Sequence, residues 1–380
     1  MHQVASLGYP SGGVREAVAQ WRNGALDDWG LERMAQAARR GGWAAQKAAG
    51  IDMIPSGELG YGDPMAETAA MVGAVPARFG PDIGRAALEV RLALANGTAG
   101  ETPATAAWAG THLRYVTPVL RDDDRWRLNA ARPVAEQLEA RSFGIVSRPV
   151  LIGPISFLMH CRTADGRPPL AYLDRVLPAY REMLAQHAIH GAAWVQMDEP
   201  ALAGDVDDSV LQEFARAYAQ LNGTGPRPKL MVATYGGGAA AALDVLVAAG
   251  IDGLHVDLVA APDQLMRVAR GWTGDRVLSV GVVDAASPAP TNQARALGLL
   301  RDAADALGGD RVQVAPSMPL TAAPVDLARV PLDLATTIET AADKLRVLRR
   351  IADAAASGGA LSDAAAPLPA RPELAPARLA

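Results

Sequence analysis

Acidic side chains stand at or near the ends of several short apolar segments in this 380-residue sequence. They are Glu58, Asp198, Glu199 and Asp257. Carboxylates that share one site raise each other's pKa unless a cation lies among them. The pattern therefore favours a site that binds an ammonium group, a metal ion or an arginine, or that uses carboxyl groups as acids and bases.

Other polar side chains end further apolar segments or could pair with the acids. We predict that the catalytic residues are Asp198, Glu58, Tyr235 and Asp257, and that Glu199 and Ser317 bind substrate. Arg15 and Arg114 are candidate partners for the carboxylates and are also predicted to bind substrate.

Each of these residues also has a structural interpretation. A carboxylate that ends a buried strand often caps the next helix, which applies to the pair Asp198-Glu199. Asp257 needs a partner because an unpaired buried charge is costly. His255 is predicted to face the surrounding helices, opposite to Asp257. The glycines of Thr234–Gly238 indicate a tight turn or a close approach of backbone to a ligand rather than a nucleotide site.

The adjacent pair His160-Cys161 could be two metal ligands or a nucleophile with its base. No second cluster of histidine and cysteine supports either role, and Cys161 is the single cysteine of the sequence. A zinc site with several cysteines is therefore excluded, and no bound metal is expected.

The elements that must position these residues alternate along the chain. Eight apolar segments have the continuous pattern of strands buried on both faces, and helical segments follow most of them. The segments are Val4–Tyr9, Asp52–Gly57, Pro149–Ile155, Ala193–Asp198, Leu230–Tyr235, Gly253–Leu258, Val277–Val283 and Val312–Ser317. Eight such units predict a single α/β barrel of the (βα)8 type, in residues 1–356. Residues 65–147 form a helical and β excursion, and residues 357–380 form a flexible Ala/Pro-rich tail.

Composition excludes several function classes. The net charge is −5 and basic residues form no block, which argues against nucleic-acid binding. No apolar stretch is long enough to cross a membrane, and the start lacks the pattern of a secretion signal. We expect a cytoplasmic protein.

Several motifs together resemble cobalamin-independent methionine synthase. They include Leu7-Gly8-Tyr9-Pro10, the run Trp43–Pro55, Pro149–Leu158, Trp194–Leu202, Gly253–Val259 and Ala315–Leu320. The likeness is to the amino-terminal barrel of that enzyme, a TIM-type fold of the methionine synthase and uroporphyrinogen decarboxylase kind.

The resemblance implies a methyltetrahydrofolate–homocysteine methyltransferase that acts in methionine biosynthesis. In the family, a second, carboxyl-terminal barrel holds zinc, and the amino-terminal barrel helps to hold the glutamate tail of the folate through lysines. Here Thr234, Gly236, Asp257 and Met318 stand at the positions of the four zinc ligands, so zinc is not expected in this chain. Trp108 is retained as a predicted substrate-binding residue, whereas Ala107 replaces a family lysine.

Three functions follow as alternatives. The chain is one component of a split methyltransferase with a separate zinc-barrel chain as partner and a folate as substrate. Alternatively, it is a diverged metal-free enzyme for a small amino acid or amine, or a binding protein for such a ligand. No tightly bound cofactor is expected in any of the three.

Overall fold

The parallel strands of the central sheet follow one another around a curled surface. The computed structural model describes residues 2–3, 12–58, 61, 63–75, 105–109, 114–223, 225–320 and 339–359. Its strands are β1 (His2–Gln3), β2 (Pro55–Ser56), β6 (Arg148–Ile152), β8 (Trp194–Asp198), β9 (Lys229–Ala233), β10 (Gly253–Asp257), β11 (Val277–Val283) and β12 (Val312–Pro316). Their order is β1-β12-β11-β10-β9-β8-β6-β2. This is the cyclic order of a (βα)8 barrel, which confirms the predicted fold class. The predicted strand Val4–Tyr9 lies outside the described residues.

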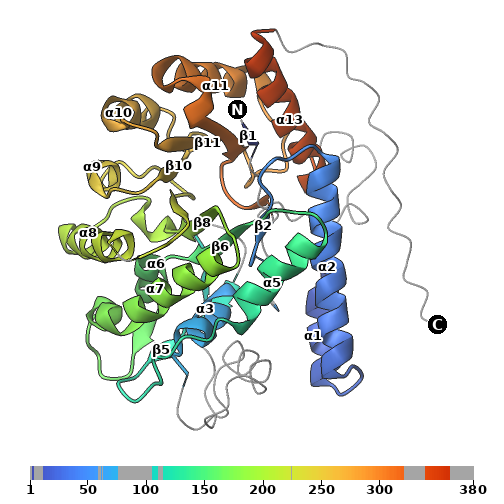
Figure 1. Ribbon diagram of the computed structural model, residues 1–380, viewed down its shortest axis with the longest axis vertical. Helices are drawn as coiled ribbons and strands as arrows, with labels where there is room; N and C mark the ends of the chain where they lie inside the picture. The colour runs from blue at the N-terminus through green and yellow to red at the C-terminus, as the bar shows by residue number, and fades with distance from the viewer. Residues whose placement is uncertain are drawn as a thin grey trace.

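Helices surround the strands, as Figure 1 shows. The α-helices are α1 (Gly12–Arg22), α2 (Asp28–Ala48), α3 (Pro64–Val72), α5 (Ala131–Ser142), α6 (Pro154–Met159), α7 (Leu173–Ile189), α8 (Asp208–Asn222), α9 (Leu243–Ala248), α10 (Gln264–Gly271), α11 (Gln293–Leu307) and α13 (Ala341–Ser357). Short 3₁₀ helices span η2 (Pro169–Tyr172), η3 (Pro200–Leu202) and η4 (Gly309–Arg311). Within the described part of the chain, no helix has the length and apolarity needed to cross a membrane.

The described residues between β2 and β6 form elements outside the barrel, as the sequence indicated. It holds an antiparallel pair, β3 (Thr105–Ala107) with β4 (Arg114–Val116), and a strand β5 (Val119–Leu120) that pairs with β7 (Arg162–Thr163). Asp63 joins β4 to the start of α3. Its carboxylate caps α3 and also accepts a hydrogen bond of 2.6 Å from the Val116 amide. The strand pair is thereby held near the ends of the barrel strands.

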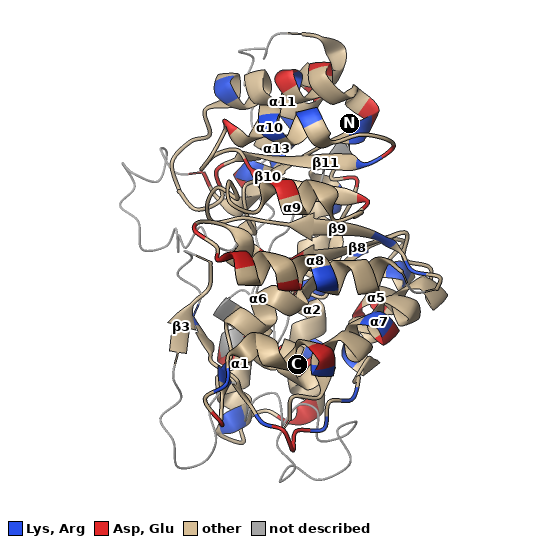
Figure 2. Ribbon diagram, turned by 90° about the vertical axis from the view of Figure 1, so that its left-hand side faces the viewer, with Lys and Arg blue, Asp and Glu red and all other residues tan. Residues whose placement is uncertain are grey.

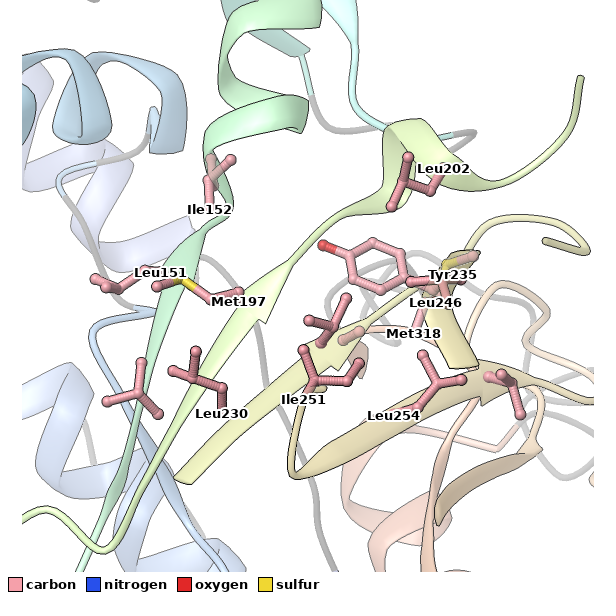
Figure 3. Close-up of a cluster of buried hydrophobic side chains, with 14 of the residues drawn as sticks. Leu151, Ile152, Met197, Leu202, Leu230, Tyr235, Leu246, Ile251, Leu254 and Met318 are labelled. Carbon is pink, nitrogen blue, oxygen red and sulfur yellow. The ribbon is translucent and has the colours of Figure 1, made fainter. Parts of the chain in front are cut away.

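Alternation along β8 and β10 separates an apolar outer face from an inner face that carries polar side chains. Met197, Leu230 and Leu254 are fully buried members of the core that packs beneath the helices (Figure 3). The alternate residues line a cavity inside the barrel, among them Gln196 and His255. Barrels of this type usually fill the interior with branched apolar side chains. The polar side chains inside this barrel therefore depart from that usual pattern.

Candidate functional site

A chain of hydrogen bonds joins three buried side chains at the carboxyl ends of β8 and β9. The Tyr235 hydroxyl donates to Asp198 Oδ2 over 2.8 Å, and Trp108 Nε1 donates to the Tyr235 oxygen over 3.2 Å. Figure 3 shows the Tyr235 ring with its oxygen directed toward β8. The excursion thus contributes Trp108 to a site whose other members come from the barrel. The structure brings three predicted site residues together here.

Asp198 is buried and surrounded by donors. Its Oδ1 accepts a hydrogen bond of 2.6 Å from Gln196 Nε2, two residues earlier on the same face of β8. Burial raises the pKa of Asp198 to about 6, while the bonds from Gln196 and Tyr235 and the charge of Arg148 oppose that rise. The carboxyl group therefore titrates close to neutral pH, where it can hold or release a proton.

Arg148 provides the positive charge inside the barrel. It begins β6 and is only 4% exposed. Burial lowers its pKa to about 10, and the charges of Glu58 and Asp198 act in the opposite direction. Glu58, which is also buried, therefore belongs to the same electrostatic group as Asp198.

The prediction that His255 faces the helices is wrong. Its Nδ1 lies 2.9 Å from Ser279 Oγ and its Nε2 lies 3.3 Å from the Ser317 carbonyl oxygen, and the ring lines the interior cavity. The physical reason is the two-residue period of a strand, which puts residues 255 and 257 on one face. Burial lowers the pKa of His255 to about 4, so the ring is neutral at pH 7.

Glu199 points away from Asp198, into the layer between sheet and helices. Its carboxylate accepts hydrogen bonds from the amides of Ile155 (3.2 Å) and Ser156 (2.6 Å) at the start of α6, and from the Tyr218 hydroxyl (2.9 Å). It is fully buried, and burial raises its pKa to about 7. Glu199 thus binds the start of α6, a helix that precedes it in the chain, and not the next helix as the structural interpretation expected.

The four residues at the family's zinc positions do not fit a zinc ion. Asp257 Oδ1 accepts the amides of Val259 (3.0 Å) and Ala260 (2.9 Å), and Thr234 Oγ1 donates to the His255 carbonyl oxygen (3.1 Å). Gly236 has no side chain to offer. Among the described residues, no group of three or more His, Cys, Asp or Glu side chains could hold a metal ion.

Burial raises the pKa of Asp257 to about 6, against the effect of its backbone donors. Ser317 is buried, and its Oγ accepts the Ala285 amide over 3.2 Å. Both residues lie at the carboxyl ends of strands. Asp257 binds the loop after its own strand, β10, whereas Ser317 binds the loop after the neighbouring strand, β11.

The remaining predicted residues lie apart from this group or outside the description. Arg114 is exposed on β4 and donates to Thr105 Oγ1 over 2.8 Å, within the excursion. The side chain of Arg15 lies outside the described residues. The His160 ring packs against Trp108 at a tilt of 42°, with ring centroids 4.9 Å apart, and its Nδ1 lies 2.7 Å from the Ser156 carbonyl oxygen. Cys161 is buried, which raises its thiol pKa well above the ordinary value.

Gly236 allows the excursion to approach the barrel. Its φ is +80°, and a Cβ there would lie 2.5 Å from the Ala109 carbonyl oxygen, next to Trp108. This turn therefore makes a close approach between two backbone segments, and the predicted approach to a ligand stays a prediction.

Reasoning from strand ends missed the residues deeper in the barrel, namely Arg148 and Gln196. A usable signal was present for both: a charged or amide side chain in an otherwise apolar strand is costly to bury without a partner.

The acidic and basic residues outside the barrel are interspersed over helices and loops (Figure 2).

Known proteins resemble this chain in sequence along most of its length. The family model described as "Cobalamin-independent synthase, N-terminal domain" matches residues 3–308. A 5-methyltetrahydropteroyltriglutamate–homocysteine methyltransferase of Xylella fastidiosa (strain M23) is 36% identical over 364 residues, covering 92% of this chain and 48% of the relative. The protein of the same name from Acidiphilium cryptum (strain JF-5) is 38% identical over 342 residues, covering 87% of this chain and 44% of the relative. The chain thus spans about half the length of these relatives.

Solved structures share the fold. A B12-independent methionine synthase from Shewanella sp. W3-18-1, in complex with selenomethionine, superposes with a TM-score of 0.63 at 15% identity, covering 88% of this chain and 91% of that one. A putative vitamin-B12-independent methionine synthase from Listeria monocytogenes gives 0.61 at 11% identity, covering 92% and 96%. On the sequence match, the chain belongs to the family of the amino-terminal domain of cobalamin-independent synthases.

Proposed function

We propose that this chain is one component of a methyltransferase of the methyltetrahydrofolate–homocysteine type and works with a separate zinc-binding barrel. The observation that carries the proposal is the alignment of 92% of the chain with 48% of a relative that bears this activity in its name. A folate is the substrate that such a component would help to bind.

The residues at the zinc positions support a division of labour. Asp257 and Thr234 bond to neighbouring backbone, and Gly236 offers no ligand. A thiol substrate is a poor nucleophile at neutral pH without a metal or base to remove its proton. The zinc chemistry would therefore belong to the partner barrel, and this chain would contribute scaffold and substrate contacts.

The test is complementation. The carboxyl-terminal half of the Xylella fastidiosa relative would be loaded with zinc and mixed with this chain, 5-methyltetrahydropteroyltriglutamate and homocysteine. We expect the two proteins to elute together and methionine to form faster than with either protein alone. The amino-terminal half of the relative is the positive control. Its success beside a failure of this chain would refute the proposal.

A second function is favoured by the Trp108–Tyr235–Asp198 hydrogen bonds. Asp198 and Glu58 are buried carboxyl groups that both act electrostatically on Arg148, and two anions in such a place attract an ammonium group. In this function the barrel binds a small amino acid or amine, with Asp198 as the group that holds or moves a proton.

Calorimetry would test this second function. Wild type would be titrated with L-methionine and with 3-(methylthio)propylamine, beside Asp198→Asn and a control, Asp284→Asn, which follows strand β11 and is not adjacent to β8. We expect binding to wild type and to the control and a loss of roughly tenfold or more in Asp198→Asn. Equal affinity of all three proteins, or no heat of binding in any, would contradict it.

A further inference from the structure

Arg148 is a buried cation that has two guanidinium nitrogens without a hydrogen-bond partner in the described part of the chain. Its Nε and Nη1 atoms are buried and have no hydrogen-bond partner in the described part of the chain. A guanidinium group carries five N–H donors and stays charged, so it cannot remove this cost by losing a proton. Leaving a buried charged donor without an acceptor is unfavourable.

The cavity beside Arg148 is lined by both polar and apolar side chains. Gln196, Tyr235, His255 and Ser279 line it together with the guanidinium. Both oxygens of Asp198 are already bonded, one to Gln196 and the other to Tyr235. Asp198 thus acts on the charge of Arg148 without supplying acceptors to Nε and Nη1.

We propose that the barrel interior is a binding site for a small carboxylate, whose oxygens accept the free N–H groups of Arg148. This inference goes beyond the proposed functions, since it requires neither a zinc barrel nor an amine. Arginine and carboxylate match in geometry and charge, and such bonds are about twice as strong as neutral ones.

The surrounding charges select a monoanion. Glu58 and Asp198 act electrostatically on Arg148, and the neutral His255 adds no second cation. A phosphate dianion would therefore meet about twice the electrostatic repulsion from these acids that a single carboxylate meets. The other polar groups of the cavity, Ser279 and Gln196, complete a lining that can hydrogen-bond a carboxylate or its bound water.

The experiment compares small anions on the full chain. Formate, acetate and propionate would be titrated by calorimetry and by thermal unfolding at constant ionic strength, with chloride as the reference anion. The proteins are wild type, Arg148→Met, Arg148→Lys and Arg216→Met, the last a control at an exposed arginine of α8. We expect saturable binding of a carboxylate to wild type and to the control. Affinity should fall roughly tenfold to a hundredfold in Arg148→Met and less in Arg148→Lys.

Two results would overturn the proposal. A wild-type response equal to that of chloride would mean that water alone satisfies the guanidinium. Equal carboxylate affinity in wild type and Arg148→Met would mean that the anion binds elsewhere. Should Arg148→Met fail to fold, the wild-type titration and Arg148→Lys still decide, because lysine lacks the Nε donor and must bind more weakly.

Discussion

Tyr235 donates its hydroxyl proton to Asp198 across the β8–β9 boundary, over 2.8 Å, and in turn accepts the indole N–H of Trp108. One hydroxyl therefore couples a carboxyl group of the barrel to the excursion that covers it. Because both bonds pass through the same oxygen, removing it affects the acid and the excursion together.

The first prediction concerns Tyr235→Phe. The lost bond stabilises the ionised carboxylate, so the pKa of Asp198 should rise above its present value of about 6. NMR titration of labelled aspartate carboxyl carbons measures this directly. Tyr180→Phe is the matched control, because its buried hydroxyl donates to the Ile152 carbonyl oxygen and not to Asp198. An unchanged or lower pKa in Tyr235→Phe would show that the bond does not act on the acid.

The titration of Glu199 should make the free energy of unfolding fall as pH rises. Its folded pKa is raised from 4.5 to about 7, so between these values the folded state binds more protons than the unfolded state. The stability that protonation provides is complete below pH 4.5 and is lost as pH rises through about 7. The shift corresponds to about 3 kcal/mol.

Glu199→Gln removes this titration. The difference in unfolding free energy between pH 4 and pH 8 should shrink by about 3 kcal/mol, as measured by urea unfolding at each pH. Asp198 and Asp257, whose pKa values are also raised, keep part of the slope in the variant. A variant with the full wild-type pH dependence would assign the slope to other groups.

The sequence predicted the fold well because strands buried on both faces have a strong local signature. The runs around β8 and β10 were identified from continuous apolar residues, and their carboxyl ends identified Asp198 and Asp257. Local pattern also predicts that Glu199, adjacent to Asp198, points the other way. The same rule, applied consistently, assigns His255 to the interior.

What the sequence did not predict depends on contacts between distant residues. Trp108 and Tyr235 are 127 positions apart, and no local pattern predicts that an excursion returns its indole to a barrel tyrosine. The free donors of Arg148 likewise depend on what Gln196 and Tyr235 already bind. Such relationships arise from tertiary packing, which single-sequence patterns do not encode.

Gly236 gives the next prediction. Its φ of +80° and the Ala109 oxygen 2.5 Å from an added Cβ mean that Gly236→Ala must push the excursion away. We expect a loss of about 1–3 kcal/mol in stability and a change in Trp108 fluorescence, measured as the difference from a Trp108→Phe background. Gly237→Ala is the control, since a Cβ there meets its nearest neighbour at an ordinary 3.6 Å. Equal effects of the two alanines would rule out the close approach as the cause.

The last prediction concerns the ionic contacts that join α2 to α5. Arg39 is 3% exposed and its Nη2 lies 2.8 Å from Glu32 Oε1 and 2.7 Å from Glu139 Oε2. Removing one member of a buried ionic group leaves uncompensated charge, so Arg39→Met should destabilise the protein by about 3–5 kcal/mol in urea unfolding. Arg40 contacts the same Glu139 at 3.0 Å but is 44% exposed, and solvent screens that pair. Arg40→Met should therefore cost less than about 1 kcal/mol. If the two variants lose equal stability, burial is not what gives the Arg39 contacts their strength.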